Sequence, residues 1–257
     1  AGAYRGYGAT QGIFAVESMV NRLADKLGMD PLEIRYKNMT HEGDVMPAYY
    51  GETANSCKLE DCLIKASDMI GYEKKPLRQV MPDGKIRGLG TAMAMQGSAI
   101  SNCDVGSVTI KLSDEGFYNV IVGCTDMGTG CDTIIAQFVA DSLDTDIDNI
   151  AVFGVDTDTS PYDSGSYASS TTYLTGMAAV KAAEQMREKL LQLAAKILEE
   201  DITKLEFDGK RVFCEETGKE VSLFDLATAS MVNNEIALEV TYSHSSPVSP
   251  PPFMAAC

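Results

Sequence analysis

The sequence predicts an α+β fold, in which helices pack with mixed sheets instead of alternating with strands in a regular series. Stretches with apolar residues at helical spacing are separated by short alternating or β-rich stretches, and no regular β-α-β repeat is present. A strong turn signal, Met81-Pro82-Asp83-Gly84, separates a mainly helical first part from a mixed second part. We therefore expect a helical N-terminal segment over residues 1–84 and an α+β domain over residues 85–257.

The first part is expected to contain three helices. The stretch 11–28 carries apolar residues near i, i+3, i+4, i+7 spacing, which predicts an amphipathic helix. A second helix follows at once, with Asp30 as its N-cap, Pro31 at its first position and Glu33 completing a capping box. A third helix is predicted over 58–70. The first and third helices are each followed by a glycine, which suits a C-terminal stop.

The second part is expected to mix strands and helices. Strands are predicted over 86–96, 106–113, 117–123, 149–154, 203–206, 211–214 and 235–243. Helices are predicted over 132–143, 175–200 and 222–231. The proline-rich segment 245–252 is expected to be extended, and the apolar run ending at Cys257 resembles an unfinished strand. We therefore expect the chain to be a fragment or a processed subunit, with its second domain incomplete at the C-terminus.

The composition argues against several classes of protein. The formal net charge is −16, so the chain would repel the phosphates of a nucleic acid. No apolar run is long enough to cross a bilayer, and no signal peptide is visible. Seven cysteines without a CxxC pair argue against a disulfide framework and against a zinc or iron–sulfur site. We expect a cytoplasmic protein that binds neither nucleic acid nor a membrane.

Three loops, each just before a predicted helix, contain residue types that bind anions. Residues 2–11 combine three glycines with the cation of Arg5 and the aromatic ring of Tyr7. Residues 126–133 carry a Gly-Thr-Gly turn, and residues 164–172 are rich in small hydroxyl residues. For each loop alone a simple helix cap is the better explanation, because these residues are favoured there. The three loops together indicate one extended anionic ligand.

Other candidate residues carry less information. His41 and His244 lie far apart in the sequence and have no neighbours of the kind that bind metals, so we expect them to be structural or exposed. The nucleophile elbow and the P-loop are both absent. The residues alone do not name the ligand.

Several stretches match one known family in order and spacing. They are Ala3-Tyr4-Arg5-Gly6-Tyr7-Gly8-Ala9-Thr10-Gln11, Leu27-Gly28-Met29-Asp30-Pro31-Leu32-Glu33, Thr125-Asp126-Met127-Gly128-Thr129-Gly130 and Gly165-Ser166-Tyr167-Ala168-Ser169-Ser170-Thr171-Thr172-Tyr173. Together they resemble the molybdopterin-binding subunit of the xanthine dehydrogenase and aldehyde oxidase family of molybdenum hydroxylases. The tail ending Phe253-Met254-Ala255-Ala256-Cys257 is similar as well. The resemblance implies the α+β fold of that family's molybdopterin-binding domain.

The resemblance also implies a cofactor and roles for particular residues. The cofactor would be molybdenum held by molybdopterin, with the cytosine dinucleotide form as an alternative, and no side chain would ligate the metal. Arg5 and Ala168 would lie near the molybdenum, and Tyr7 would stack on the substrate. The cofactor contacts implied by the family are Arg5, Gly6, Gly128, Thr129, Ala168, Ser169 and Thr171. The sequence departs from many members at Thr129, where they have Gln, and at Ser170, where they have Arg.

The implied reaction is hydroxylation of an electron-poor carbon, in a purine-like or nicotinate-like heterocycle or in an aldehyde, with water as the source of oxygen. Electrons would pass to an iron–sulfur subunit and an FAD subunit. The family's general base is a glutamate in a Gly-rich motif that this sequence lacks, so we assign no catalytic residue and expect another segment of the molybdenum subunit to supply it. Tyr7 and the loop from Gln96 to Ile100 are the candidates for contact with the small-molecule substrate. The alternatives are a non-catalytic binding or assembly module, or an isolated domain fragment of the same fold without cofactor.

Overall fold

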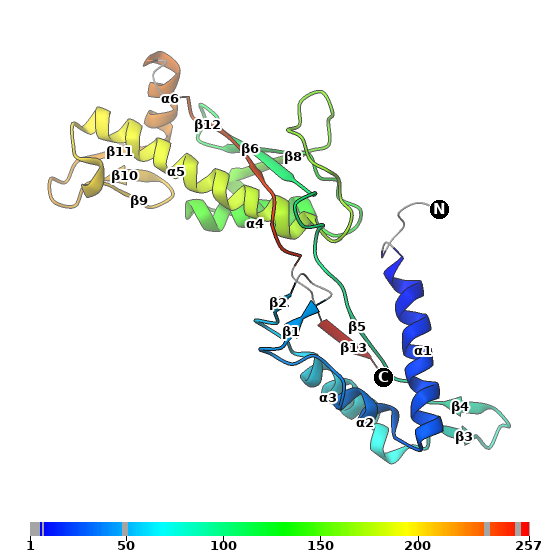
Figure 1. Cartoon of the computed structure of the whole chain (residues 1–257). Helices are drawn as coiled ribbons and strands as arrows, with labels where there is room; N and C mark the ends of the chain where they lie inside the picture. Colours follow the sequence, from blue (N-terminus) through cyan, green and yellow to red (C-terminus); the bar gives the residue numbers. More distant parts are fainter. Residues whose placement is uncertain (1–5, 7, 48–50, 234–236, 250–252, 257) are drawn as a thin grey trace. The chain divides into compact units, whose positions relative to one another are not determined.

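The computed structural model describes residues 6, 8–47, 51–233, 237–249 and 253–256 of the chain (Figure 1). Its internal contacts divide the chain into two compact units, the first formed by residues 1–98 with 248–257 and the second by residues 99–247. The boundary expected at residue 84 lies in the turn between two strands of the first unit. Helices with small sheets make up both units, and the largest sheet is mixed, which confirms the predicted α+β class. In the described part of the chain, no helix is long and apolar enough to span a membrane.

The described residues of the first unit include three α-helices and three pairs of short strands. The helices are α1 (Ala9–Leu27), α2 (Pro31–Tyr36) and α3 (Leu59–Ile70). The antiparallel pairs are β1 (Val45–Met46) with β2 (Glu52–Thr53), β3 (Arg78–Val80) with β4 (Ile86–Gly88), and β5 (Ala92–Met95) with β13 (Phe253–Ala256). The single strand predicted over 86–96 is wrong, because the Leu-Gly-Thr segment at 89–91 divides it into β4 and β5. The strand expected at the C-terminal end is confirmed, and its partner β5 lies far away in the sequence.

Helix α2 begins as its sequence predicts. The carboxylate of Asp30 accepts a hydrogen bond from the Leu32 N–H at 2.7 Å, and Pro31 occupies the first turn. Glu33 forms an ion pair with Lys37 one turn further on, at 2.6 Å, instead of completing a capping box. The apolar side of α2 then packs with α3 in a small core that contains Leu32, Met39, Leu59, Leu63 and Tyr72.

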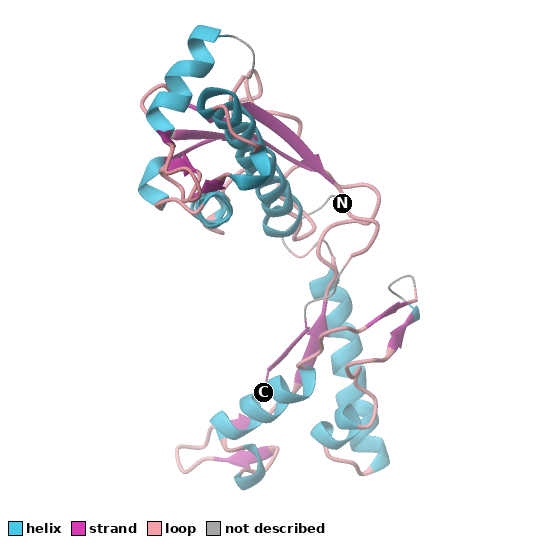
Figure 2. Cartoon of the chain, turned by 90° about the vertical axis from the view of Figure 1, so that its left-hand side faces the viewer, coloured by secondary structure: helices cyan, strands magenta, loops and turns pink. Residues whose placement is uncertain are grey.

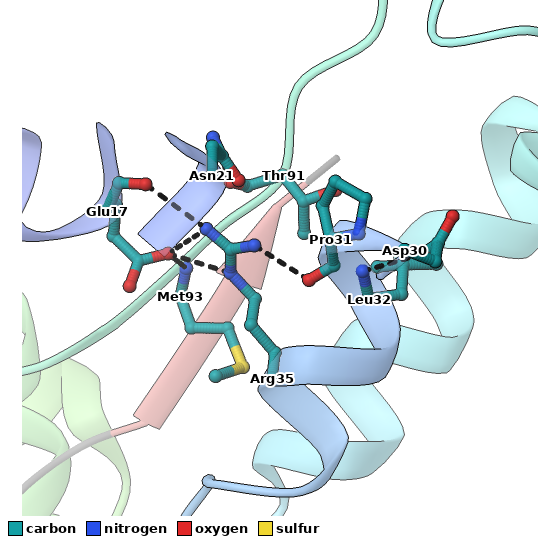
Figure 3. A network of polar contacts seen from close by, with 8 residues as sticks. All are labelled: Glu17, Asn21, Asp30, Pro31, Leu32, Arg35, Thr91 and Met93. Atoms are coloured by element: carbon teal, nitrogen blue, oxygen red, sulfur yellow. Dashed lines mark hydrogen bonds and ion pairs between the residues drawn. The ribbon is translucent and has the colours of Figure 1, made fainter. Parts of the chain in front are cut away.

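A buried ion pair joins α1 to α2 and β5. Arg35 is 2% exposed, and its Nε and Nη2 donate to one carboxylate oxygen of Glu17 at 2.9 and 2.7 Å. Its Nη1 donates to the Pro31 carbonyl at 2.8 Å, and the Met93 N–H reaches the same Glu17 oxygen at 2.8 Å. Figure 3 shows Glu17, Pro31 and Met93 gathered around the guanidinium group. This network holds the helix to its neighbours, because the rest of α1 contributes little burial.

The apolar face of α1 is largely exposed in the described part of the chain. Its helical spacing is confirmed, but of its residues only Ala24 is buried. Phe14, Val16 and Met19 are 75, 60 and 60% exposed. Amphipathic spacing therefore predicts the helix without predicting where its apolar face is buried.

The second unit is built on a four-stranded sheet with the order β12-β6-β7-β8. Its strands are β6 (Gly106–Leu112), β7 (Tyr118–Val122), β8 (Ile150–Gly154) and β12 (Glu239–His244). All neighbours are antiparallel except β7 and β8, which are parallel and connected through α4 (Cys131–Leu143). The long helix α5 (Gly176–Leu198) packs beside α4 and against β6 and β12 (Figures 1 and 2). The core lies between these helices and the sheet, and includes Val108, Ile110, Val120, Ile135 and Met186.

A small sheet and a further helix complete the second unit. The strands β9 (Glu206–Phe207), β10 (Arg211–Phe213) and β11 (Glu220–Ser222) form an antiparallel sheet, and α6 (Leu223–Asn233) follows. The strand predicted over 203–206 is wrong over most of its length, since residues Ile202–Lys204 form a 3-10 turn capped by Asp201. The strand predicted from residue 235 begins at Glu239, and residues 234–236 lie outside the described residues.

Candidate functional site

Most of the predicted ligand-contacting residues of the second unit lie at one edge of its main sheet. Register places the start of β6 at Gly106 beside the ends of β7, β8 and β12. Three segments therefore meet there, namely residues 99–105, 123–130 and 155–175. We call these three segments together the loop edge. Helix α4 starts directly from the second segment, and α5 follows the π-helical turn Thr171–Thr175 of the third. Backbone N–H groups at helix starts make such an edge suited to an electron-rich ligand.

Small residues and hydroxyl groups fasten the three segments together. The Ser166 hydroxyl accepts from the Thr125 N–H at 2.9 Å and donates to the Thr125 carbonyl at 2.8 Å. The Ser164 hydroxyl makes the same paired contact with the backbone of Val105, at 3.1 Å in both directions. A Cβ at Gly123 would lie 2.5 Å from the Cβ of Asp163, so the segments approach closely only because this residue is glycine.

The predicted residues Ala168 and Ser169 form a strained turn. The Ser170 N–H donates to the Tyr167 carbonyl at 3.0 Å, and the two residues between have φ of 51° and 59°. Positive φ at both central positions is the pattern of a type I′ turn, which favours Asn and Gly. Each non-glycine residue in this region costs about 1–2 kcal/mol. Strain of this kind persists only where surrounding contacts impose it, and such residues cluster at functional sites.

The strained turn exposes hydrogen-bond donors. Among the residues that the structure describes, no acceptor receives the N–H of Ala168 or of Ser169. Ser169 is exposed and Ala168 half-buried, whereas Ser170 beneath them is buried and donates to the Gly165 carbonyl at 3.3 Å. Thr171, at the start of the π-helical turn, is half-buried. The turn therefore presents neutral donors at the loop edge.

The Gly-rich loop at 128–130 differs from an open phosphate cradle. One oxygen of Asp126 accepts from the N–H groups of Gly128, Thr129 and Gly130 at 2.8, 3.0 and 3.2 Å. These backbone hydrogen bonds hold the pKa of Asp126 below its ordinary range. The amides expected to face an anion are thus occupied by the chain's own carboxylate. A ligand contact at Thr129 would use its exposed side chain, and at Gly128 the open space where a Cβ would meet nothing within 4 Å.

The loop edge carries no positive side chain of its own. Between Lys111 and Lys181 the sequence has no lysine or arginine, while Asp104, Asp126 and Asp163 lie in the three segments. The carboxylate of Asp163 accepts from the Gly165 N–H at 2.8 Å and from the Thr175 hydroxyl at 3.0 Å. In the described residues no group of three or more His, Cys, Asp or Glu side chains is arranged to hold a metal ion. Ligand binding here would rest on neutral backbone and hydroxyl donors.

The residues predicted in the opening motif are described only in part. Arg5 and Tyr7 lie outside the described residues, so their predicted positions near metal and substrate stay predictions. Gly6 belongs to the first unit and has φ of 89°, a conformation that favours glycine, and its carbonyl accepts from the Ala9 N–H at 2.9 Å. Within the second unit, the structure brings the loops around Gly128 and Ala168 to the same edge of the sheet.

Two residues that position the site were not predicted from the sequence. Ser166 joins two of the segments, and Asp126 organises the Gly-rich loop. The contact of Ser166 depends on tertiary structure and has no local signal. The contact of Asp126 does have a local signal, because an aspartate two residues before a glycine is typical of a turn in which the aspartate side chain binds the following backbone.

The fit of this edge to a pterin cofactor can be judged from the donors present. Molybdopterin is large, carries a phosphate and has many hydrogen-bonding atoms. The unpartnered N–H groups of Ala168 and Ser169, the exposed hydroxyl of Thr129 and the open side of Gly128 match the neutral part of such a ligand. The described residues of the loop edge thus fit the group, without supplying a cation for its phosphate.

An α+β unit with two helix starts and a strained, donor-bearing turn at one sheet edge is suited to binding a ligand. Comparison with known proteins specifies the ligand class. Two family models, both described as molybdopterin cofactor-binding domain, match residues 65–257 and residues 1–39. The chain therefore belongs to the molybdopterin-binding domain family of the molybdenum hydroxylases.

Individual relatives agree with this family. The chain is 33% identical to the xanthine dehydrogenase molybdenum-binding subunit of Escherichia coli O157:H7, over 98% of this chain and 35% of that protein. It is 37% identical to a probable hypoxanthine oxidase of Escherichia coli strain K12, over 88% of this chain and 24% of that protein. The solved structure of reconstituted CO dehydrogenase from Oligotropha carboxidovorans matches with a TM-score of 0.79 and 26% identity, over 97% of this chain and 34% of that chain. The chain thus spans only a quarter to a third of the length of these proteins.

Proposed function

We propose that this chain is part of a molybdenum hydroxylase that oxidises a purine-like or nicotinate-like heterocycle, or an aldehyde, with water as the source of oxygen. The observation that carries the proposal is the strained turn at Ala168 and Ser169, whose N–H groups have no acceptor among the described residues, in a chain of the molybdopterin-binding family. Relatives named for xanthine, hypoxanthine and nicotine oxidation support the reaction class.

In this proposal the residues of the chain bind and orient the cofactor. The backbone N–H groups of Ala168, Ser169 and Thr171 donate to it from one side of the loop edge. Gly128 permits close approach from the other side, and Thr129 offers its hydroxyl. When bound, the molybdenum and its pterin supply the two-electron redox chemistry that the side chains of this protein lack.

The remaining roles follow the family resemblance. Arg5 and Gly6 would approach the cofactor from the opening loop, with Arg5 beside the molybdenum and providing the cation that the loop edge does not have. Tyr7 would stack on the substrate. The cofactor would be molybdopterin or its cytosine dinucleotide form, and the electrons would pass to iron–sulfur and FAD partner subunits. Another segment of the molybdenum subunit would supply the glutamate base.

The proposal is tested by hydroxylation assays on the full-length subunit purified with its partners. A purine, a nicotinate and an aldehyde are each incubated with the complex, an artificial electron acceptor and water labelled with heavy oxygen. We expect one class of compound to gain a hydroxyl group that carries the label. A complex that contains molybdenum and pterin but hydroxylates none of the three would contradict the proposal and favour a non-catalytic binding module.

A further inference from the structure

A buried carboxylate at the loop edge makes two hydrogen bonds that the roles above do not use. Asp104 is 0% exposed. Its Oδ1 accepts from the Tyr167 hydroxyl at 2.9 Å, and its Oδ2 accepts from the Ile100 N–H at 2.7 Å. Oδ1 is thus bound by Tyr167, the residue just before Ala168 and Ser169. Oδ2 is bound by Ile100, which belongs to the same segment 99–105 as Asp104. The carboxylate connects the two segments through its two ends.

Both connected segments are strained. Ala99 and Asn102 have φ of 66° and 55°, and Ala168 and Ser169 have φ of 51° and 59°. The Ala99 N–H donates to the Ala168 carbonyl at 2.7 Å, so two of the strained residues are bonded to each other directly. Asparagine adopts this conformation readily, but alanine and serine do not, so the positive φ angles of Ala99, Ala168 and Ser169 point to contacts between the segments.

The contact through Asp104 is well suited to impose this conformation. Hydrogen bonds to an ionised group are shorter and stronger than those between neutral groups, and a buried carboxylate is costly unless its donors stay in place. The hydrogen bond from Tyr167 to this carboxylate raises the pKa of Tyr167, so the hydroxyl keeps its proton and remains a donor. The two segments therefore cannot separate without leaving a carboxylate oxygen unbound.

We propose that Asp104 is a positioning residue, which through Tyr167 and the Ile100 amide holds segment 99–105 against the turn at 168–169 and keeps the donors of that turn in place. The segment 96–100 was predicted to contribute to the substrate pocket. The same carboxylate would thus align the loop that meets the cofactor with the loop that meets the substrate. The catalytic part of this inference rests on the proposed function; the structural part does not.

The structural part is tested by amide hydrogen exchange in the chain. Tyr167→Phe removes only the hydroxyl, and Asp104→Asn leaves one acceptor oxygen where two donors must bind. We expect exchange of the Ala99 amide to become about tenfold faster in both variants, as befits loss of a hydrogen bond to a charged group. If Asp104→Asn does not fold, the milder Tyr167→Phe still provides the measurement.

The matched control is Tyr118→Phe. Its buried hydroxyl has no hydrogen-bond partner among the described residues, and it lies at the start of β7, at the opposite end of the sheet from the loop edge. We expect the exchange of Ala99 to stay as in the wild type in this variant. An unchanged rate in Tyr167→Phe, or an equal increase in the control, would overturn the inference.

The catalytic part is tested in the assembled enzyme, with molybdenum content measured alongside activity. We expect Tyr167→Phe to lower kcat about tenfold at unchanged molybdenum content, because the donors are displaced and not removed. Tyr118→Phe should leave kcat unchanged. Full activity in Tyr167→Phe would overturn the positioning role even if exchange were faster. A wild-type complex without molybdenum would instead contradict the proposed function, and the exchange result would still be decisive for the structural part.

Discussion

Replacing Arg35 should destabilise the first unit more than any change to an exposed ion pair. Arg35→Met keeps most of the length of the side chain but removes the guanidinium group. The Glu17 carboxylate, whose side chain is 13% exposed, then keeps the Met93 N–H as a hydrogen-bond donor but has lost its cation. Breaking a buried pair by removal of one partner costs about 3–5 kcal/mol. The exposed pair between Lys37 and Glu33 has side chains 61 and 50% exposed, so Lys37→Met should cost less than about 0.5 kcal/mol.

The free energy of unfolding is measured by urea titration with circular dichroism, and amide exchange in α1 and α2 assigns the loss to the first unit. The double variant Arg35→Met with Glu17→Gln removes both charges, so it should recover part of the loss. If Arg35→Met were no more destabilising than Lys37→Met, the network would not be what holds α1 in place.

Four further results are expected. Burial holds the pKa of His244 below its ordinary value of 6.5. The neutral imidazole therefore makes its full contribution to stability above pH 6.5, and this contribution is lost as the pH falls through the lower pKa of the folded state. Between about pH 7 and pH 5 the urea midpoint should therefore fall further in the wild type than in His244→Asn, and equal falls would contradict this. Gly12→Ala should raise the free energy of unfolding by up to about 1 kcal/mol, since Gly12 lies in the first turn of α1 and a Cβ there meets nothing within 4 Å. Gly106→Ala should lower the free energy of unfolding by about 1–3 kcal/mol, since the new Cβ would lie 2.5 Å from the Thr175 nitrogen. If the two glycine variants changed the free energy of unfolding in the same direction, the packing argument would be refuted. Asp126→Ala should speed exchange of the three loop amides that it binds and weaken cofactor retention about tenfold, and unchanged exchange would show that the carboxylate does not organise the loop.

Apolar periodicity predicted the helices but not always their environment. The stripe of α5 is buried at Ala183, Met186 and Leu190, because the sheet that covers it belongs to the same unit. The stripe of α1 has the same spacing, yet Val16 is 60% exposed and Leu23 is 49% exposed. Periodicity shows that one face is apolar and says nothing about which part of a protein covers it.

The loops of the candidate site could be predicted, whereas their conformation could not. Glycine and hydroxyl residues before helices mark the segments around Gly128 and Ala168 from sequence alone. The left-handed turn has no such signal, because alanine and serine do not favour positive φ and their conformation depends on contacts with distant residues such as Ala99. The amides near Gly128 were expected to bind an anion, and the carboxylate that occupies them is the chain's own Asp126. Local sequence thus indicates where donors gather, and tertiary contacts decide which of them are available to a ligand.

The content of molybdenum and pterin in the full-length subunit, purified with its partners, tests the central claim most directly. Elemental analysis measures the metal, and fluorescence of the oxidised pterin measures the organic part. We predict that both are present in stoichiometric amounts, because the chain belongs to the molybdopterin-binding family and its loop edge presents hydrogen-bond donors. An intact, folded complex that contains neither molybdenum nor pterin would contradict the account.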